Sequence, residues 1–311
     1  MDNERRQEFW NLISTSEKPI DFSSFERDVP ASLFRYRPIT DKSINALRMD
    51  RLYFSTSNYY DDPFDTLIFV DKKRLHREID ELALDKIDRR LLEGGLLQFG
   101  IDATSIDLSA AGGMMHSFVE ALYGMLSNAL KKDIFTVCFG ESGTNEQLWL
   151  KYANQYKGFV IEYDFKSLLH GNKDVFDSKN ACIDGTLVYS YPVSYSDERF
   201  DATNYFKNLV LCLAGRPDLV GNPIRMAMDR HCVCLHKGIC HSNDQEWRLI
   251  IDAPMPSCPS YMVVMPKSIL LGLRIGPMDK ENLLAIGKEK GIPIYETYIT
   301  DEYRLEKKLV S

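Results

Sequence analysis

Apolar and polar residues alternate along several short stretches of the chain, and this period of two predicts β strands. The clearest stretch is SLFRYRPI, residues 32–39, where we expect the strand to stop at Pro38 because proline cannot donate a ladder hydrogen bond. Two others, DIFTVCFGE and KGFVIEYDF, are rich in β-branched and aromatic residues. The predicted strands cover residues 32–39, 51–57, 133–141, 157–165, 185–195, 246–251, 260–266, 268–275 and 292–299.

Apolar residues recur at helical spacing elsewhere, most clearly between residues 72 and 132. Leu75, Ile79, Leu82 and Ile87 follow one another near this spacing, and a second apolar stripe runs through MMHSFVEALYGMLSNALKK. Because predicted strands flank this region, we expect residues 72–132 to form a helical insertion. Shorter helices are predicted up to about residue 13 and over residues 40–50, 145–156, 204–215, 224–237 and 279–291.

The order of these elements indicates the fold class. Strands and helices are mixed without strict alternation, which is typical of an α+β protein with a mixed, largely antiparallel sheet. The sequence contains no internal repeat and no low-complexity linker, so we expect residues 1–311 to form a single domain.

Charge and cysteine content narrow the setting. The formal net charge of −7 argues against broad binding to nucleic acid or to an anionic membrane. No apolar run reaches the length of a membrane span, and the charged start, MDNERRQEFWNL, lacks the apolar core of an export signal. Seven cysteines without an export signal predict reduced thiols in the cytoplasm.

The stretch HCVCLHKGICH, residues 231–241, holds three cysteines and three histidines. Cys232 and His236 are four residues apart on a predicted helix that should stop at Gly238, and residues beyond that glycine could supply further zinc ligands. However, the C-x-C spacing matches no recognised zinc module, and residues two apart on a helix face different directions. We therefore predict a helix and its end here, with zinc binding as the less favoured alternative and no metal expected.

The stretch YYDDPFD, residues 59–65, is predicted to form a turn in which aspartates bind backbone N–H groups. The alternative is a divalent-cation site of a nuclease or phosphoesterase, in which Asp61, Asp62 and Asp65 act with Glu141.

Six blocks of the sequence occur in an order that resembles a bacterial family of unknown function. They are FRYRP, RLYFSTSNYYDDPFD, VCFGE, LWLKYANQYKGFVIEYD, DQEWRLI and PKSILLGLRIGP. The resemblance implies a gene context of phage defence or mobile elements. Asp61, Gly140 and Asp244 depart from the family pattern, which has Asn, Ser and often Glu there, whereas Lys237 matches a recurring lysine.

The same blocks show a weaker likeness to the ADP-ribosyltransferase superfamily. It is carried by Arg35 or Arg37 on an early strand, by Ser55, Thr56 and Ser57 with Tyr59 or Tyr60 nearby, and by Asp244-Gln245-Glu246 on a late strand. The likeness implies a split sheet that holds NAD. In that site an arginine would bind the pyrophosphate, a tyrosine would stack on the nicotinamide, and Glu246 would be catalytic. Tyr36, Lys237 and Arg248 complete the set of candidate NAD-binding residues.

The sequence therefore leads to a main hypothesis and two alternatives. The main one is an NAD-dependent ADP-ribosyltransferase or NAD glycohydrolase-like effector, which takes a small nucleotide substrate and a macromolecular acceptor. Asp244, shorter than glutamate, suits the acceptor role less well. The alternatives are a metal-dependent nuclease or phosphoesterase that uses the Asp61–Asp65 turn, and a non-catalytic sensor or partner-binding module of a defence operon. The main hypothesis requires the arginines, a tyrosine and Glu246 to meet at one open cleft.

Overall fold

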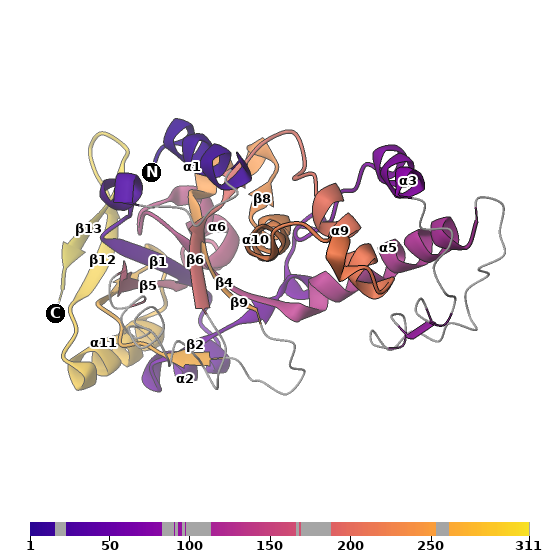
Figure 1. The fold of residues 1–311 in the computed structure, drawn as a ribbon. Helices are drawn as coiled ribbons and strands as arrows, with labels where there is room; N and C mark the ends of the chain where they lie inside the picture. Colours follow the sequence, from indigo (N-terminus) through magenta and orange to yellow (C-terminus); the bar gives the residue numbers. More distant parts are fainter. Residues whose placement is uncertain are drawn as a thin grey trace.

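The computed structural model describes residues 1–15, 23–82, 90, 93–94, 97, 113–165, 168, 188–252 and 261–310 (Figure 1). Within these residues a nine-stranded sheet forms the centre of the fold. Its order is β13 (Leu305–Leu309), β12 (Ile294–Ile299), β11 (Ser268–Leu271), β5 (Phe159–Asp164), β1 (Ser32–Arg37), β4 (Ile134–Gly140), β9 (Glu246–Asp252) and β6 (Val188–Pro192), with β3 (Ser55–Thr56) paired to β4. Only the β11–β12 pair in this sheet is parallel among the strands described, so the predicted mixed, largely antiparallel sheet is confirmed.

Two small sheets lie beside the main one. In the first, β2 (Arg51–Tyr53) pairs antiparallel with β10 (Tyr261–Val263). In the second, β7 (Ser194–Tyr195) pairs parallel with β8 (His236–Lys237). Through the second sheet, β8 brings Lys237 to the start of β9, where its ammonium binds Glu246.

The helices match most of the predicted helical stretches. They are α1 (Asn3–Thr15), α2 (Asp41–Arg48), α3 (Lys72–Glu81), α5 (Gly113–Asp133), α6 (Glu146–Tyr152), α9 (Thr203–Leu213), α10 (Pro223–Val233) and α11 (Pro277–Lys290), with short 3-10 turns η1 (Ser23–Asp28), η2 (Ser57–Tyr59), η5 (Pro217–Leu219) and η6 (Ile239–Asp244). Thr40 caps α2 through a reciprocal capping box, and Gly291 ends α11 in the left-handed conformation. No described helix has the length and apolar character needed to cross a membrane.

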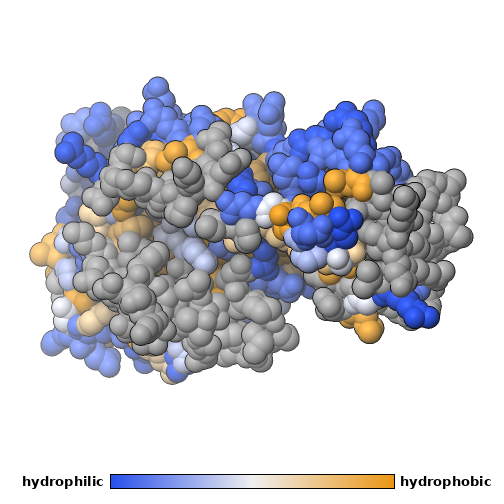
Figure 2. Space-filling model, in the orientation of Figure 1, coloured by the Kyte–Doolittle hydropathy of each residue, from blue (hydrophilic) through white to orange (hydrophobic). Residues whose placement is uncertain are grey.

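Two large apolar cores hold the elements together. One joins α1, α3, α5, α9 and α10 to the β6 side of the sheet, where Phe118 of α5 and Phe206 of α9 are fully buried. The other lies between the sheet and helices α2 and α11. Figure 1 shows β12 and β13 at one side of the molecule and α3, α5 and α9 at the other. Figure 2 shows a strongly hydrophilic surface around α3, which agrees with its charged sequence.

The predicted insertion 72–132 is helical where it is described, in α3 and α5. Most of the stretch between these helices lies outside the described residues, including Ile87 of the predicted apolar stripe. The predicted helix pattern nevertheless identified the buried residues of α3, since Leu75 and Ile79 both face the first core.

The structure differs from the predicted elements in two boundaries and in one strand that was not predicted. The predicted strand 51–57 is divided into β2 and β3, which pair with different strands, and Ser57 already begins a 3-10 turn. The helix expected to stop at Gly238 ends at Val233, because the N–H groups of Cys234 and Leu235 bond back three residues and the chain then enters β8. The strand predicted last is followed by β13, whose exposed sequence LEKKL gave no apolar signal because it forms the edge of the sheet.

The pairing between β1 and β4, in the middle of the sheet, is the shortest of its strand pairings. β1 pairs with β5 at six positions and β4 pairs with β9 at seven, but β1 and β4 share only the pair Phe34–Gly140. Past that pair β4 continues beside β3 instead, through Thr136 and Phe135. The two halves of the sheet therefore diverge between β1 and β4.

Gly158 holds the backbone close to the C-terminal end of β1. A Cβ atom at this position would lie 2.2 Å from the carbonyl oxygen of Arg37, so no larger residue fits without a backbone shift. This close contact fixes the end of β1, and with it the backbone of Arg37, beside β5.

Candidate active site

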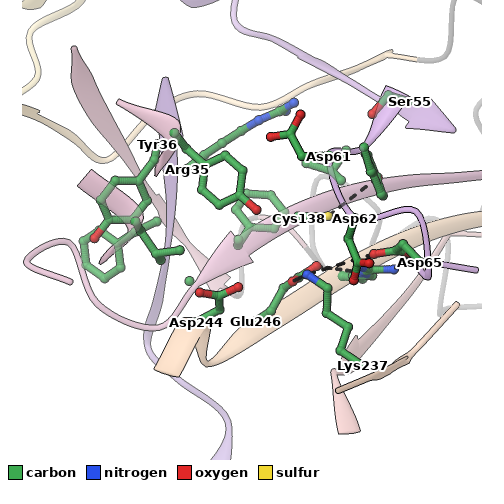
Figure 3. Close-up of a pocket in the computed structure, with 18 of the residues that line it drawn as sticks. Arg35, Tyr36, Ser55, Asp61, Asp62, Asp65, Cys138, Lys237, Asp244 and Glu246 are labelled. Atoms are coloured by element: carbon green, nitrogen blue, oxygen red, sulfur yellow. Dashed lines mark hydrogen bonds and ion pairs between the residues drawn. The ribbon is translucent and has the colours of Figure 1, made fainter. Parts of the chain in front are cut away.

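A cavity of about 290 Å³ opens where β1 and β4 diverge (Figure 3). Its walls come from β1, β4, the start of β9, the turn after η2, helix α6 and strand β8. The lining residues are Phe34, Arg35, Tyr36, Arg37, Ser55, Tyr59, Tyr60, Asp61, Asp62, Asp65, Val137, Cys138, Phe139, Gly140, Leu148, Tyr152, Lys237, Asp244, Glu246 and Arg248. The arginines, the tyrosines and Glu246 named from the sequence thus meet at one cavity.

Glu246 is the centre of a buried network of charges. Its Oε1 accepts a hydrogen bond from Nε of Arg248 at 2.6 Å, and its Oε2 accepts one from Nζ of Lys237 at 2.7 Å. Arg248 also binds both carboxylate oxygens of Asp65, at 2.8 and 2.5 Å. Glu246 is 5% exposed and Arg248 1% exposed, so these four charges neutralise one another away from water.

Strand alternation explains how the network is assembled. Glu246 and Arg248 lie on one face of β9, whereas Trp247 and Leu249 point into the core on the other face. Across the ladder Glu246 pairs with Gly140 and Arg248 pairs with Cys138. Asp65 comes from the turn after η2, and Lys237 comes from β8.

The network determines the charge of its members. Burial raises the pKa of Glu246, but Arg248 and Lys237 outweigh it and hold the pKa well below the usual value. Burial lowers the pKa of Lys237, and the carboxylates of Glu246 and Asp65 overcome this effect and raise it. Glu246 is therefore a carboxylate at neutral pH, and Lys237 is an ammonium.

Arg35 and Arg37 form a second charged feature of the cavity. Both are half-buried, and in the described part of the chain no carboxylate lies within 4.0 Å of either guanidinium. Nη2 of Arg35 donates to the carbonyl oxygen of Tyr53 at 3.2 Å. Burial lowers the pKa of Arg35, and the charge of Arg35 together with burial lowers the pKa of Arg37 to about 10. Two adjacent cations without an anion are suited to binding one.

From the sequence alone, Arg35 or Arg37 on one strand could equally form a structural ion pair with Glu246 on another. That pair does not form in the structure. Glu246 uses Lys237 and Arg248 as its partners instead, which leaves the β1 arginines available to the cavity.

The tyrosines have different environments. Tyr59 is 83% exposed at the cavity, so one ring is available to a ligand. The hydroxyl of Tyr60 hydrogen-bonds to Oγ1 of Thr136, and the guanidinium of Arg248 lies 5.6 Å from the centre of the Tyr60 ring. Tyr36 lines the cavity, but its hydroxyl donates to the carbonyl of Ser142 at 2.7 Å and accepts the N–H of Asn145 at 3.0 Å. Tyr36 therefore also fastens the start of α6 to β1.

The serine-threonine stretch is only partly in the cavity. Ser55 lines it, whereas Thr56 and Ser57 are buried and lie outside the lining. The structure therefore brings only Ser55 of the three predicted residues to the cavity, because Thr56 alternates away from Ser55 on β3 and Ser57 turns into η2.

Among the lining residues outside the predicted set, Cys138 and Tyr152 carry groups that can take part in chemistry. The apolar strand around Cys138 predicts a packing residue, yet Cys138 lies opposite Arg248 and faces the cavity, and burial together with Glu246 raises the pKa of its thiol to about 12. The spacing of Trp149 and Tyr152 on a short helix predicts that both face the core. Trp149 is fully buried, but Tyr152 lines the cavity. The only signal in the sequence is the W-x-x-Y spacing on a short helix. This spacing puts both rings on one face, but it does not show which of them is buried in the core and which lines the cavity.

The acidic turn mainly serves the protein itself. Asp62 accepts the N–H of Phe64 at 2.9 Å, as the turn interpretation predicts, and Asp65 is held by Arg248. Glu141 lies outside the lining and binds Arg6 at 2.5 Å and the indole N–H of Trp247 at 2.6 Å. In the described residues no group of three or more His, Cys, Asp or Glu side chains is arranged to hold a metal ion.

In HCVCLHKGICH only Lys237 reaches the cavity. Cys232 and Cys234 are buried in the first core, where burial raises the pKa of both thiols, that of Cys234 to about 12. Nδ1 of His236 lies 2.9 Å from the carbonyl oxygen of Cys232. Cys232 and Cys234 therefore pack inside the protein, whereas Cys240 is exposed, and Lys237 is the residue of this segment that lines the cavity.

His231 should make the stability of the protein depend on pH. It is 2% exposed beside Tyr189 and Tyr191, and burial lowers its pKa from 6.5 to about 4. Between pH 6.5 and pH 4 the imidazole is therefore protonated in the unfolded chain and neutral in the folded protein. The free energy of unfolding is highest above pH 6.5 and falls as the pH drops toward 4. The free energy of unfolding of the wild type should fall between pH 7 and pH 5. In His231→Phe, which keeps an aromatic ring, we expect this fall to be smaller by roughly 2 kcal/mol. Urea unfolding at both pH values measures this, and an unchanged difference would contradict it.

In the comparisons with known proteins, no protein-family model, no curated protein and no solved structure matches the chain.

Proposed function

We propose that the protein binds NAD in the cavity between β1 and β4 and breaks its bond between nicotinamide and ribose, as an ADP-ribosyltransferase or NAD glycohydrolase does. One observation carries the proposal. Two guanidiniums that have no carboxylate partner among the described residues line the same cavity as a buried, ionised glutamate. They come from opposite sides of the pair Phe34–Gly140.

The basic residues suit the two phosphates of NAD. Arg35 and Arg37 provide planar arrays of donors that match phosphate oxygens, and a pyrophosphate would supply the negative charge that their surroundings lack. Tyr59, which is exposed beside them, offers a ring for stacking on a flat heterocycle.

Glu246 suits the reacting end. When the bond from C1′ of the ribose to N1 of nicotinamide breaks, its electron pair leaves with nicotinamide, which becomes neutral, and positive charge develops on the ribose. A fixed carboxylate stabilises that charge and accepts a hydrogen bond from the 2′-hydroxyl. Lys237 and Arg248 bind one oxygen each, the thiol of Cys138 also acts on the carboxylate, and Glu246 lines the cavity, where it can accept a further hydrogen bond. Water or an acceptor nucleophile then adds to C1′ and loses a proton.

Two further features support the proposal without deciding between transfer and hydrolysis. The single pair that joins β1 to β4 agrees with the split sheet implied by the likeness to ADP-ribosyltransferases. The six sequence blocks favour a role as an effector in phage defence.

The direct test is to incubate the purified protein with NAD and to quantify nicotinamide and ADP-ribose by chromatography, with and without a cell lysate as a source of acceptors. Turnover, and a rise in melting temperature on addition of ADP-ribose, are expected. If NAD stays intact under both conditions and ADP-ribose leaves the melting temperature unchanged, the proposal fails.

Arg35→Gln should weaken the binding of ADP-ribose and raise the KM for NAD roughly ten- to hundredfold, because charge-assisted hydrogen bonds to a phosphate are lost. We expect little change in kcat, since the pyrophosphate is held equally in the ground and transition states. Arg274→Gln is the matched control, because Arg274 is exposed and lies outside the cavity. Equal affinities of both variants for ADP-ribose would show that Arg35 does not bind the phosphates.

A further inference from the structure

The backbone of Glu246 is held by two side chains from distant parts of the sequence. Its N–H donates to the hydroxyl oxygen of Tyr195 at 2.7 Å, and its carbonyl oxygen accepts a hydrogen bond from Nη1 of Arg6 at 2.9 Å. Both hydrogen bonds are buried. Arg6 and Tyr195 lie outside the cavity lining, so their link to the site is the peptide backbone of Glu246 and not a ligand.

Arg6 belongs to α1 and points into the protein, where it is 1% exposed. Its guanidinium donates to the carbonyl oxygens of Val193 and Glu246, at 3.1 and 2.9 Å, and to Oε1 of Glu141 at 2.5 Å. The same oxygen of Glu141 accepts the indole N–H of Trp247 at 2.6 Å. Arg6 therefore ties α1 to the first two residues of β9. A buried guanidinium with these partners has little freedom to move.

Tyr195 belongs to the small sheet of β7 and β8. It pairs with Lys237 in that sheet, and the ammonium of Lys237 binds Oε2 of Glu246 at 2.7 Å. The guanidinium of Arg6 lies 5.8 Å from the centre of the Tyr195 ring, so the two residues that hold the Glu246 backbone also lie against each other. The small sheet thus holds the main chain of Glu246 through Tyr195 and its carboxylate through Lys237.

Gln245, the residue before Glu246, shows why the backbone needs these contacts. It is left-handed, with φ of 44° and ψ of 49°, a conformation that residues other than glycine seldom adopt. The chain turns here from η6 into β9. Backbone of this kind persists where its surroundings fix it. The hydrogen bonds to Arg6 and Tyr195 are made by the residue directly after this turn, so they set the position from which the side chain of Glu246 extends.

We infer that Arg6 and Tyr195 are positioning residues, which fix the backbone of Glu246 so that its carboxylate stands at the ribose of bound NAD. The inference rests on the proposed function and adds two residues to it. A carboxylate stabilises developing charge best when it is already in place, and a misplacement of about 1 Å can cost roughly a hundredfold in rate. The inference therefore gives α1 and β7 a part in the reaction although neither element lines the cavity.

The test measures NAD cleavage by Tyr195→Phe, which keeps the ring and removes the oxygen that accepts the N–H of Glu246. We expect kcat to fall about tenfold, because the carboxylate is displaced by less than 1 Å or so. The KM for NAD and the affinity for ADP-ribose should stay within about twofold of the wild type, because the arginines of β1 are untouched. Tyr191→Phe is the matched control. Tyr191 and Tyr195 are both 8% exposed, but the hydroxyl of Tyr191 contacts the sulfur of Met228 at 3.6 Å, so its loss should leave kcat unchanged.

Arg6 is tested by a pair of substitutions. Arg6→Met removes every donor of the side chain, whereas Arg6→Lys keeps the positive charge and part of the donors. We expect kcat to fall in Arg6→Met and to recover in part in Arg6→Lys, with the affinity for ADP-ribose unchanged in both. Wild-type kcat in both variants would show that Arg6 does not position Glu246. If Arg6→Met does not fold, Arg6→Lys and Tyr195→Phe still decide the question.

A double-mutant cycle shows whether the loss passes through Glu246. In the Glu246→Gln background Tyr195→Phe should have little further effect on kcat, since the carboxylate that it positions is absent. A purely structural loss would instead multiply with that of Glu246→Gln. If Tyr195→Phe lowers kcat by the same factor in both backgrounds, the inference is overturned.

The outcomes separate this inference from the proposed function. Hydrogen exchange at the amide of Glu246 should be faster in Tyr195→Phe than in the wild type and in Tyr191→Phe, because the amide has lost its acceptor. If the wild type cleaves NAD, and Tyr195→Phe and Arg6→Met cleave it equally fast, only the positioning role is overturned. If the wild type leaves NAD intact, the proposed function fails and the positioning role fails with it, whatever the exchange rates are.

Discussion

Arg248→Met should lower the free energy of unfolding by about 3–5 kcal/mol, the loss typical of removing one partner from a buried charge network. Arg248 is 1% exposed and donates to Glu246, to both oxygens of Asp65 and to the carbonyl of Cys234. Methionine fills a similar volume but donates nothing. Asp65 would then keep the hydroxyl of Thr66 and the distant ammonium of Lys237, 4.0 Å away, as its contacts. Urea unfolding at pH 7 measures the loss.

Arg216→Met is the matched control for this prediction. Arg216 makes two hydrogen bonds to Asp218, like the bidentate pair of Arg248, but both residues are exposed. Exposed ion pairs contribute at most about 1 kcal/mol, so this variant should be nearly as stable as the wild type. If Arg248→Met does not fold, Asp65→Asn gives the second measurement, and its loss should also exceed that of Arg216→Met. Equal stability of the buried and exposed variants would show that the network does not stabilise the fold.

The sequence predicts the elements of the central sheet well where a strand buries one face. β1 and β4 follow their predicted ranges. Both strands bury apolar residues, such as Leu33 and Val137, on one face, and this gives the alternation that predicts a strand. It fails for β13, because an exposed edge strand needs no apolar pattern. It also fails for β8, a strand of two residues that is held by β7. That strand is formed by tertiary contacts and has no periodicity that a sequence could reveal.

The sequence predicts which residues belong to the candidate site, but it does not predict which of them contact one another. The resemblance to ADP-ribosyltransferases placed Arg35, Arg37 and Glu246 together, and all three line one cavity. The sequence does not show the ion-pair partners of Glu246. Lys237 lies beside it only because β8 pairs with β7, and the charges in a strand sequence do not indicate which ion pairs form. The role of Asp65 was hidden for the same reason, because it looks like any other aspartate in a turn.

Glu246→Gln should reduce the kcat for NAD cleavage about a thousandfold and leave KM within a fewfold of the wild type. In the proposed reaction the carboxylate acts mainly on the positive charge of the transition state, and removal of one such fixed group costs about two to three orders of magnitude. The substitution also removes a charge from the buried network, so a loss of activity could arise from damage to the fold. Melting temperatures and the affinity for ADP-ribose must therefore be measured on the same samples.

Lys237→Met distinguishes the two causes. It breaks the 2.7 Å pair with Glu246 from the other side, while Glu246 remains ionised through its 2.6 Å bond to Arg248. If Glu246 acts on the substrate, Lys237→Met should retain much more turnover than Glu246→Gln at a similar loss of stability. If both variants lose turnover equally and in proportion to their loss of melting temperature, Glu246 is a structural residue of the network. The catalytic carboxylate must then be sought at Asp244, a buried acid of the cavity that is not held by Arg248.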